Sequence, residues 1–164
     1  MSNGIKVKKR NGRGTESLDL EKMHKMVEDA TTGLAGVSAS QVEIQSGIQF
    51  YDGITTAEIQ EILIKSASDL IDLEHPNYQF VAARLLLFSI RKSLYGRSRE
   101  LPKLEDHIVK CVTQEVYDGD IYSKYSKEDI EKANGYIDHN RDFLFTYAGL
   151  RQVADKYLVQ DRST

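Results

Sequence analysis

Cysteine is almost missing from this sequence, since Cys111 is the single example among 164 residues. One cysteine excludes an internal disulfide, and no Cys-x-x-Cys pair or His/Cys spacing suited to zinc occurs. The four histidines, His24, His75, His107 and His139, are scattered along the chain. We therefore expect no metal bound directly by the protein. Because Cys111 lies on an apolar helical stripe, we interpret it as an inert buried thiol.

Long apolar runs and a basic charge balance are also lacking. No segment approaches the roughly 20 apolar residues that cross a bilayer, and the first residues lack the apolar core of a signal peptide. We therefore expect a cytoplasmic chain without a membrane partner. The net charge is −3, whereas a general nucleic-acid binder is usually basic, so no nucleic-acid partner is expected. Hydrophobic content of 40% with only two prolines predicts a folded, mainly α protein.

The basic residues that stand out form two clusters far apart in the sequence. The first comprises Lys6, Lys8, Lys9, Arg10 and Arg13, and the second comprises Arg84, Arg91, Lys92, Arg97 and Arg99. Cationic side chains and the free amides of a helix N-terminus bind phosphate, so we expect both clusters to converge on one polyphosphate. Two alternatives stay open: an edge strand kept soluble by lysines, and salt bridges at a domain interface.

Residue patterns predict a hairpin followed by helices. Alternation over 5–10, turn residues at 11–14 and a return over 15–18 predict a short β-hairpin. Helical spacing over 20–34 predicts the first amphipathic helix. A second helix, capped by Ser38 or Ser40, is predicted to end at the turn of residues 52–53. Its apolar side is predicted to comprise Ile44, Ile48 and Tyr51.

The next two helices have clear start and stop signals. Thr55 with Glu58 forms a capping box before a third helix, although Thr55 and Thr56 also fit a plain helix cap. The region 78–95 is apolar almost all round and ends before Gly96, which predicts a fourth helix buried on more than one side.

Composition changes after Gly96, and we place a domain boundary between residues 96 and 97. Three features then predict a second helical segment over 97–164. They are the apolar face of Leu104, Ile108, Cys111 and Val112, the capping pair Ser126 and Asp129, and the stripe of Tyr147, Leu150, Ala154, Tyr157 and Leu158. The polar run 138–142 is interpreted as a helix end with local charge pairing.

An ordered set of short motifs resembles the amino-terminal region of the class I ribonucleotide reductase large subunit, which begins with an ATP-cone. In the first part these are Val7-Lys8-Lys9-Arg10-Asn11-Gly12, Leu18-Asp19-Leu20-Glu21-Lys22, Gln49-Phe50-Tyr51-Asp52-Gly53-Ile54-Thr55-Thr56, Ile64-Lys65-Ser66-Ala67 and Asn77-Tyr78-Gln79-Phe80-Val81-Ala82-Ala83-Arg84-Leu85-Leu86. Later matches are Arg91-Lys92-Ser93-Leu94-Tyr95-Gly96, Tyr117-Asp118, Asp138-His139-Asn140-Arg141-Asp142 and Lys156-Tyr157-Leu158-Val159-Gln160-Asp161-Arg162.

The resemblance implies a fold and a nucleotide site. The fold is an ATP-cone helical bundle with a small N-terminal β-hairpin over 1–96, followed over 97–164 by a helical segment that precedes a ten-stranded α/β barrel absent from this sequence. Nucleotide contacts carried over from the family fall on Val7, Lys9, Arg10, Glu16, Ser17, Leu18, Asp19, Leu20, Glu21, Lys22, Thr56, Gln60 and Lys92. Relatives often have histidine at Gln60, whose neutral amide cannot supply the contact of a protonated imidazole.

The resemblance also implies a regulatory role within an enzyme. ATP and dATP would be allosteric effectors of ribonucleotide reduction, with Mg accompanying the nucleotide. The family's chemistry needs a thiyl radical and a cysteine pair, which this sequence lacks, so we expect the chain alone to be inactive. We expect two partners in a hetero-oligomer. One is the remaining catalytic part of the large subunit, which contains the barrel, and the other is a radical-generating small subunit. Either the sequence is a truncated piece or the subunit is made in two pieces.

Two other functions stay open. One is a stand-alone nucleotide sensor such as a cone-bearing repressor, although this sequence lacks the cysteine-rich zinc module of such proteins. The other is an assembly module with a vestigial ATP-cone.

Overall fold

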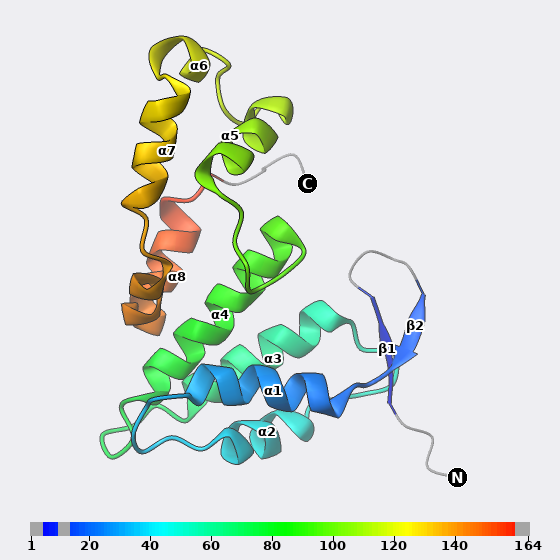
Figure 1. The fold of residues 1–164 in the computed structure, drawn as a ribbon. Helices are drawn as coiled ribbons and strands as arrows, with labels where there is room; N and C mark the ends of the chain where they lie inside the picture. The colour runs from blue at the N-terminus through cyan, green and yellow to red at the C-terminus, as the bar shows by residue number, and fades with distance from the viewer. Residues whose placement is uncertain (1–4, 10–13, 160–164) are drawn as a thin grey trace.

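The N-terminal hairpin is attached to the loop before the third helix. In the computed structural model, which describes residues 5–9 and 14–159, strands β1 (Lys6–Lys8) and β2 (Thr15–Ser17) pair antiparallel. The Lys8 N–H donates to the Ile54 carbonyl at 2.9 Å, and the Gly53 N–H donates to the Lys6 carbonyl at 2.8 Å. The hairpin is therefore fixed to the start of the third helix (Figure 1).

Helices make up most of the described chain, which confirms the mainly α prediction with a small hairpin. They are α1 (Leu20–Thr31), α2 (Ala39–Gly47), α3 (Thr56–Asp69), α4 (Tyr78–Tyr95), α5 (Leu104–Thr113), α6 (Ile121–Lys124), α7 (Lys127–Gly135), the 3-10 helix η1 (His139–Leu144) and α8 (Tyr147–Lys156). In the described ranges no helix is both long enough and apolar enough to cross a bilayer.

The predicted caps begin several of these helices. At α3 the Thr55 hydroxyl accepts from the Glu58 N–H at 3.1 Å, while the Glu58 carboxylate accepts from the Thr55 N–H at 2.8 Å. The Thr55 hydroxyl also donates to the Glu58 carboxylate at 2.7 Å, and this hydrogen bond, followed by that from the Thr55 N–H, lowers the pKa of Glu58. Ser38 caps α2 and Ser126 caps α7. The capping box predicted from Thr55 and Glu58 is therefore confirmed.

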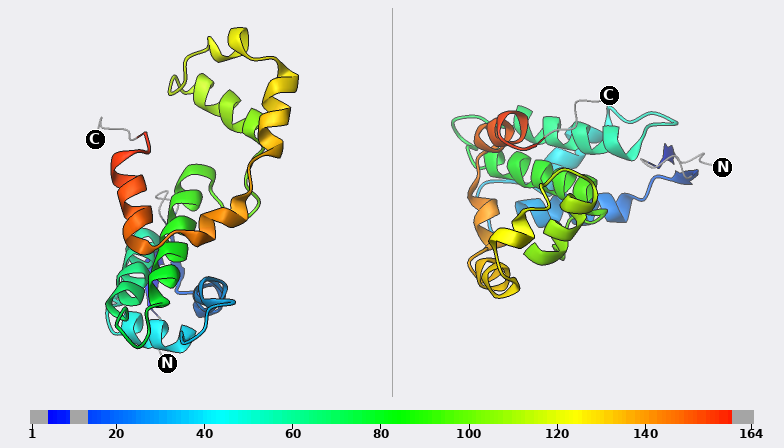
Figure 2. Two further views of the ribbon diagram at one scale, coloured as in Figure 1. Left: turned by 90° about the vertical axis from the view of Figure 1, so that its left-hand side faces the viewer. Right: turned by 90° about the horizontal axis from the view of Figure 1, so that it is seen from above.

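Helix α4 is the centre of the core. It packs against α1, α3 and α8, and ten of its side chains are buried, as predicted for a helix covered on more than one side. Figure 2 shows α3 and α8 lying along it. Gly96 ends the helix in the left-handed conformation with φ of 72°, which a residue with a Cβ adopts only with strain. The core is completed by side chains from β1, α1, α2, α3 and α8.

The apolar side predicted for the second helix is wrong. Ile44, Ile48 and Tyr51 are 69%, 82% and 52% exposed. The helix ends at Gly47, so Ile48 and Tyr51 no longer follow its periodicity. Val42 and Ser46, one turn apart, form its buried side instead. The Tyr51 hydroxyl donates to the Glu58 carboxylate at 3.0 Å, so this residue supports the α3 cap.

The segment after Gly96 has two parts. Helices α5 and α7 pack together, with Ile108 of α5 and Ile130 of α7 buried, and project away from the bundle (Figure 1). Helix α8 returns to α4, and its Leu150 is buried in the main core. Tyr157 and Leu158 follow the end of α8 and are exposed rather than part of its stripe. The domain division at residue 97 stays a prediction.

The ion pair between His24 of α1 and Glu43 of α2 predicts a pH dependence. The His24 Nδ1 and Glu43 Oε1 atoms are 2.7 Å apart, and the hydrogen bond with Glu43 raises the pKa of His24 above its ordinary 6.5. A raised folded-state pKa stabilises the fold below the unfolded pKa, and this stabilisation is lost as pH rises through the folded pKa.

We expect Glu43→Gln to return the His24 pKa toward 6.5 and to destabilise the protein at pH 6 but not at pH 8. NMR titration of the His24 ring and urea unfolding at the two pH values measure both effects. In a His24→Gln background the Glu43 substitution is expected to show no pH dependence. An unchanged His24 pKa in Glu43→Gln would contradict the prediction.

Candidate functional site

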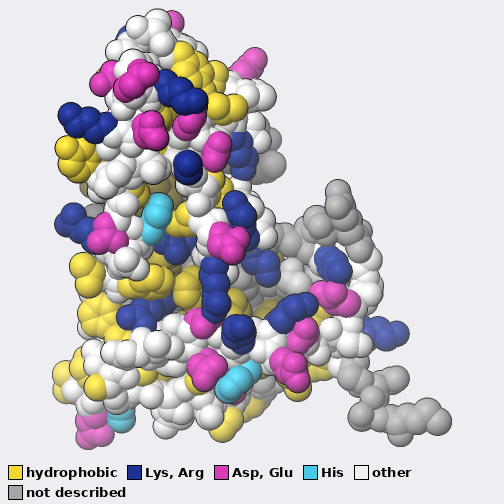
Figure 3. Space-filling model, in the orientation of Figure 1, with side chains coloured by type: hydrophobic (Ala, Val, Ile, Leu, Met, Phe, Trp, Pro, Cys, Tyr) yellow, Lys and Arg dark blue, Asp and Glu magenta, His cyan; other side chains and the backbone are white. Residues whose placement is uncertain are grey.

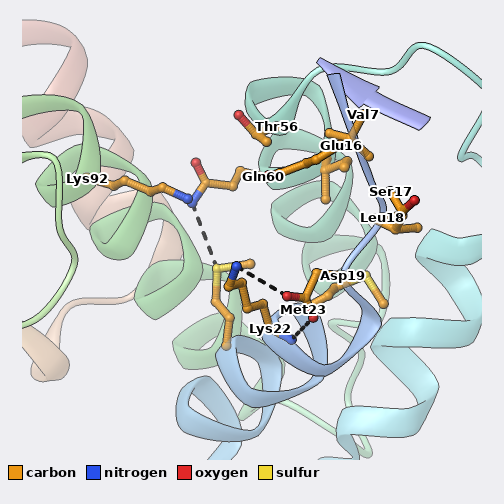
Figure 4. A pocket seen from close by; sticks show the side chains of 12 residues that line it. Val7, Glu16, Ser17, Leu18, Asp19, Lys22, Met23, Thr56, Gln60 and Lys92 are labelled. Carbon is orange, nitrogen blue, oxygen red and sulfur yellow. Dashed lines mark hydrogen bonds and ion pairs between the residues drawn. The ribbon is translucent and has the colours of Figure 1, made fainter. Parts of the chain in front are cut away.

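Four structural elements, which come from three regions distant in sequence, surround a cavity of about 280 Å³. They are the hairpin, the start of α1, the first turns of α3 and the end of α4 (Figure 4). The lining residues are Val7, Glu16, Ser17, Leu18, Asp19, Lys22, Met23, Met26, Thr56, Ile59, Gln60 and Lys92. The hairpin's attachment to the loop before α3 holds Val7 and Thr56 on the same wall.

Nine of the residues predicted from the sequence lie together in this cavity. These are Val7, Glu16, Ser17, Leu18, Asp19, Lys22, Thr56, Gln60 and Lys92. Lys9 does not line the cavity, but its ammonium lies 2.9 Å from the Glu16 carboxylate, which does. Leu20 is 60% exposed, and neither it nor Glu21 lines the cavity. Arg10 lies outside the described residues.

Three apolar lining residues were missing from the sequence prediction. Met23 and Met26 lie one turn apart on α1, and Ile59 lies on the first turns of α3. Their helical spacing marks them as core residues, and only the adjacent polar positions of α1 indicated a site. Methionine is polarisable and adapts its shape, so this apolar wall suits a flat aromatic ring.

The polar groups of the cavity are arranged with carboxylates near the hairpin. The Asp19 carboxylate caps α1 by accepting from the Lys22 N–H at 3.0 Å, and it lies 3.2 Å from the Lys22 ammonium. The backbone hydrogen bond from Lys22 is the main reason that the pKa of Asp19 is lowered. Asp19 is therefore an acceptor at neutral pH. Lys92 approaches from the other side, on α4 (Figure 4).

Gln60 lies at the base of the cavity and is 4% exposed. Its amide nitrogen donates to the Met26 sulfur at 3.8 Å, and its carbonyl accepts from the Ser89 hydroxyl at 3.4 Å. These contacts connect α3 with α1 and α4. The Gln60 side chain is therefore a neutral amide held in a fixed position.

Two arginines predicted to approach a polyphosphate have structural partners instead. Arg84 donates to the Ala30 and Thr32 carbonyls at 3.1 and 2.7 Å, which satisfies the end of α1. Arg91 is buried and donates to the Asp142 carboxylate at 2.6 Å. Both guanidinium groups lie beside the Phe143 ring. The prediction that they face a phosphate is therefore wrong, because the returning segment of η1 covers this side of α4.

Comparison with known proteins identifies the family of the region that contains this cavity. The ATP cone domain family matches residues 5–93, which include every lining residue. The chain is 46% identical over 164 residues to ribonucleoside-diphosphate reductase 1 subunit alpha of Escherichia coli K12, and 45% identical over 164 residues to the Haemophilus influenzae subunit alpha. It is 42% identical over 152 residues, 92% of the chain, to the subunit alpha of Enterobacteria phage T4.

The chain spans about a fifth of the length of these relatives, 21%, 21% and 20% respectively. The family match covers the hairpin and helices α1 to α4, and the similarity to the reductase subunits continues through α8. The chain therefore belongs to the ATP-cone family and corresponds to the amino-terminal region of class I ribonucleoside-diphosphate reductase alpha subunits.

Proposed function

We propose that this chain is the regulatory part of a ribonucleoside-diphosphate reductase large subunit and that it binds ATP or dATP in the cavity beside the hairpin. The observation that carries the proposal is the convergence of nine sequence-predicted residues, from three regions distant in sequence, on one cavity in an ATP-cone. The nucleotide would act as an allosteric effector of ribonucleotide reduction, accompanied by Mg.

The cavity has a chemically suitable place for each part of the nucleotide. Adenine packs against the wall of Met23, Met26 and Ile59. The carboxylates of Glu16 and Asp19 accept from the adenine amino group and the ribose hydroxyl, since an ionised carboxylate is only an acceptor. Lys22 and Lys92 bind phosphates, and Lys9 exchanges the nearby Glu16 for a phosphate oxygen.

Catalysis would belong to other parts of the large subunit. The sequence has only Cys111, and this thiol is buried in the α5–α7 unit. The catalytic remainder of the large subunit and a radical-generating small subunit would be the partners of the regulatory part in a hetero-oligomer.

Isothermal titration calorimetry of the chain with ATP and dATP tests nucleotide binding. We expect both to bind, and we expect Lys92→Ala to weaken binding by about tenfold or more, because one charge-assisted contact contributes about 1.5–3 kcal/mol. Lys132→Ala, which removes an exposed lysine on α7, is the matched control and should bind as the wild type does. Failure to bind either nucleotide, or equal affinity of Lys92→Ala, would refute the proposal.

A second candidate function is assembly without nucleotide control. It is favoured by exposed Tyr157 and Leu158, which follow α8 and offer apolar surface for docking. Co-purification with a catalytic large-subunit fragment separates the two functions. Capture that is unchanged by ATP and by Lys92→Ala would favour the assembly module, whereas capture that changes with ATP would favour regulation.

A further inference from the structure

The cavity described above continues into a second one. The second cavity has a volume of about 380 Å³ and shares four lining residues with the first, Lys22, Met26, Gln60 and Lys92. The first cavity has a volume of about 280 Å³, just below the roughly 300–1,000 Å³ that is typical of small-molecule and cofactor sites. A nucleoside triphosphate therefore needs additional space, and the shared residues place that space beside Lys22 and Lys92.

The second cavity is strongly cationic. Its charged lining consists of Lys22, Lys25, Lys92, Arg97 and Arg99 with the carboxylates of Asp29 and Glu100. Figure 3 shows Lys and Arg side chains gathered on this face, across the region between α1 and the end of α4, with carboxylates among them. With five cations and two carboxylates, this cavity suits the phosphates of a nucleotide better than its base or ribose.

The turn at Gly96 brings the two arginines to this position. After Gly96 the chain leaves α4 and turns back, so that Arg99 forms an ion pair with Asp29 of α1. Arg97 pairs with Glu100 at 3.6 Å. The side chains of Arg99 and Asp29 are 58% and 34% exposed, and those of Arg97 and Glu100 are 54% and 86% exposed. Exposed pairs contribute little free energy, so a phosphate can displace the carboxylates.

We propose that Arg97 and Arg99 bind the terminal phosphates of the adenine nucleotide, and that Arg99 exchanges Asp29 for phosphate when the nucleotide is bound. Guanidinium groups bind phosphate oxygens in bidentate geometry, which a lysine cannot do. Both arginines lie beyond residue 93, where the family match ends, so the segment after α4 becomes part of the site. The inference rests on the proposed nucleotide binding.

Calorimetry with ATP, ADP and AMP tests this assignment. The double variant Arg97→Gln/Arg99→Gln is expected to bind ATP about tenfold more weakly while its affinity for AMP changes less than about twofold, because AMP lacks the terminal phosphates. Lys124→Gln/Lys132→Gln removes two exposed charges from α6 and α7 and controls for long-range electrostatics. This control is expected to keep the wild-type ratio of ATP to AMP affinity.

Asp29→Asn distinguishes a ligand role from a structural one. If Arg99 binds phosphate, removing its competitor tightens ATP binding by about two- to fivefold, the range expected for an exposed pair. If Arg99 only holds the segment against α1, Asp29→Asn and Arg99→Gln break the same contact and change ATP affinity in the same direction. Asp29→Asn also keeps the test decisive if the double variant does not fold.

The outcomes separate this inference from the proposed function. Wild-type protein that binds no adenine nucleotide overturns both. Suppose that the wild type binds ATP and that Lys92→Ala weakens this binding. If Arg97→Gln/Arg99→Gln then loses no ATP affinity, or loses ATP and AMP affinity equally, only the assignment of the arginines is overturned. Opposite effects of Asp29→Asn and Arg99→Gln on ATP affinity support it.

Discussion

Replacing Tyr78 by alanine is expected to lower the free energy of unfolding by about 4 kcal/mol. Tyr78 is 1% exposed and begins α4, in the core shared with the other helices. Its hydroxyl accepts from the Ser38 N–H at 3.0 Å and donates to the Gln41 side-chain carbonyl at 2.5 Å. The substitution leaves a cavity and also removes the link between α4 and the first turn of α2. Small domains have about 5–15 kcal/mol in total, so much of the stability is lost.

Urea unfolding followed by circular dichroism measures this effect. Tyr78→Phe keeps the ring and removes only the hydroxyl, so we expect a smaller loss of about 1–3 kcal/mol from the unpaired Ser38 and Gln41 groups. Tyr136→Ala is the matched control, since Tyr136 is 78% exposed, and should change stability by less than about 0.5 kcal/mol. Equal effects of Tyr78→Ala and Tyr136→Ala would show that Tyr78 is not a core anchor.

Removing the carboxylate of Asp142 is expected to cost about 3 kcal/mol of stability, since it leaves the Arg91 guanidinium buried without its ionic partner. The Arg91 side chain is 9% exposed and that of Asp142 is 35% exposed, with 2.6 Å between Nη2 and Oδ2. The pair joins α4 to η1, and the partial exposure of Asp142 places the estimate at the low end of the range for buried pairs.

The comparison of single and double substitutions gives the decisive measurement. Arg91→Met/Asp142→Leu replaces both charges by apolar groups and is expected to be more stable than Asp142→Leu alone. The control is Glu105→Gln, which breaks the exposed ion pair between Lys127 of α7 and Glu105 of α5, whose Nζ and Oε1 atoms are 3.4 Å apart. This substitution is expected to lower the free energy of unfolding by less than about 1 kcal/mol. If Asp142→Leu is no more harmful than Glu105→Gln, the pair does not hold η1 on α4.

Local chemistry accounts for the parts of the fold that the sequence predicts well. Thr55 and Glu58 specify a helix start with side-chain groups only three residues apart, and Gly96 specifies a left-handed exit. The face of α2 was mispredicted because Ile48 and Tyr51 were counted in a helix that ends at Gly47. The partner of a helix face is a long-range property, and periodicity gives no information about it.

Charge and polarity in the sequence marked four residues that line the cavity, Glu16, Asp19, Lys22 and Lys92. Met23, Met26 and Ile59 were missed because a residue lining a cavity and a residue filling a core have the same apolar spacing. Arg91 was misassigned because its partner, Asp142, lies 51 residues away. No short-range pattern relates these two positions.

Arg91 and Lys92 are consecutive residues of α4, yet Arg91 contacts η1 and Lys92 lines the cavity beside the hairpin. If a ligand in this cavity shifts the end of α4, we expect the attachment of η1 through Arg91 to shift with it. By thermodynamic reciprocity, whatever stabilises that attachment changes ligand affinity by the same factor. Under the proposed function, one turn of α4 would therefore couple effector binding to the position of η1 on the bundle.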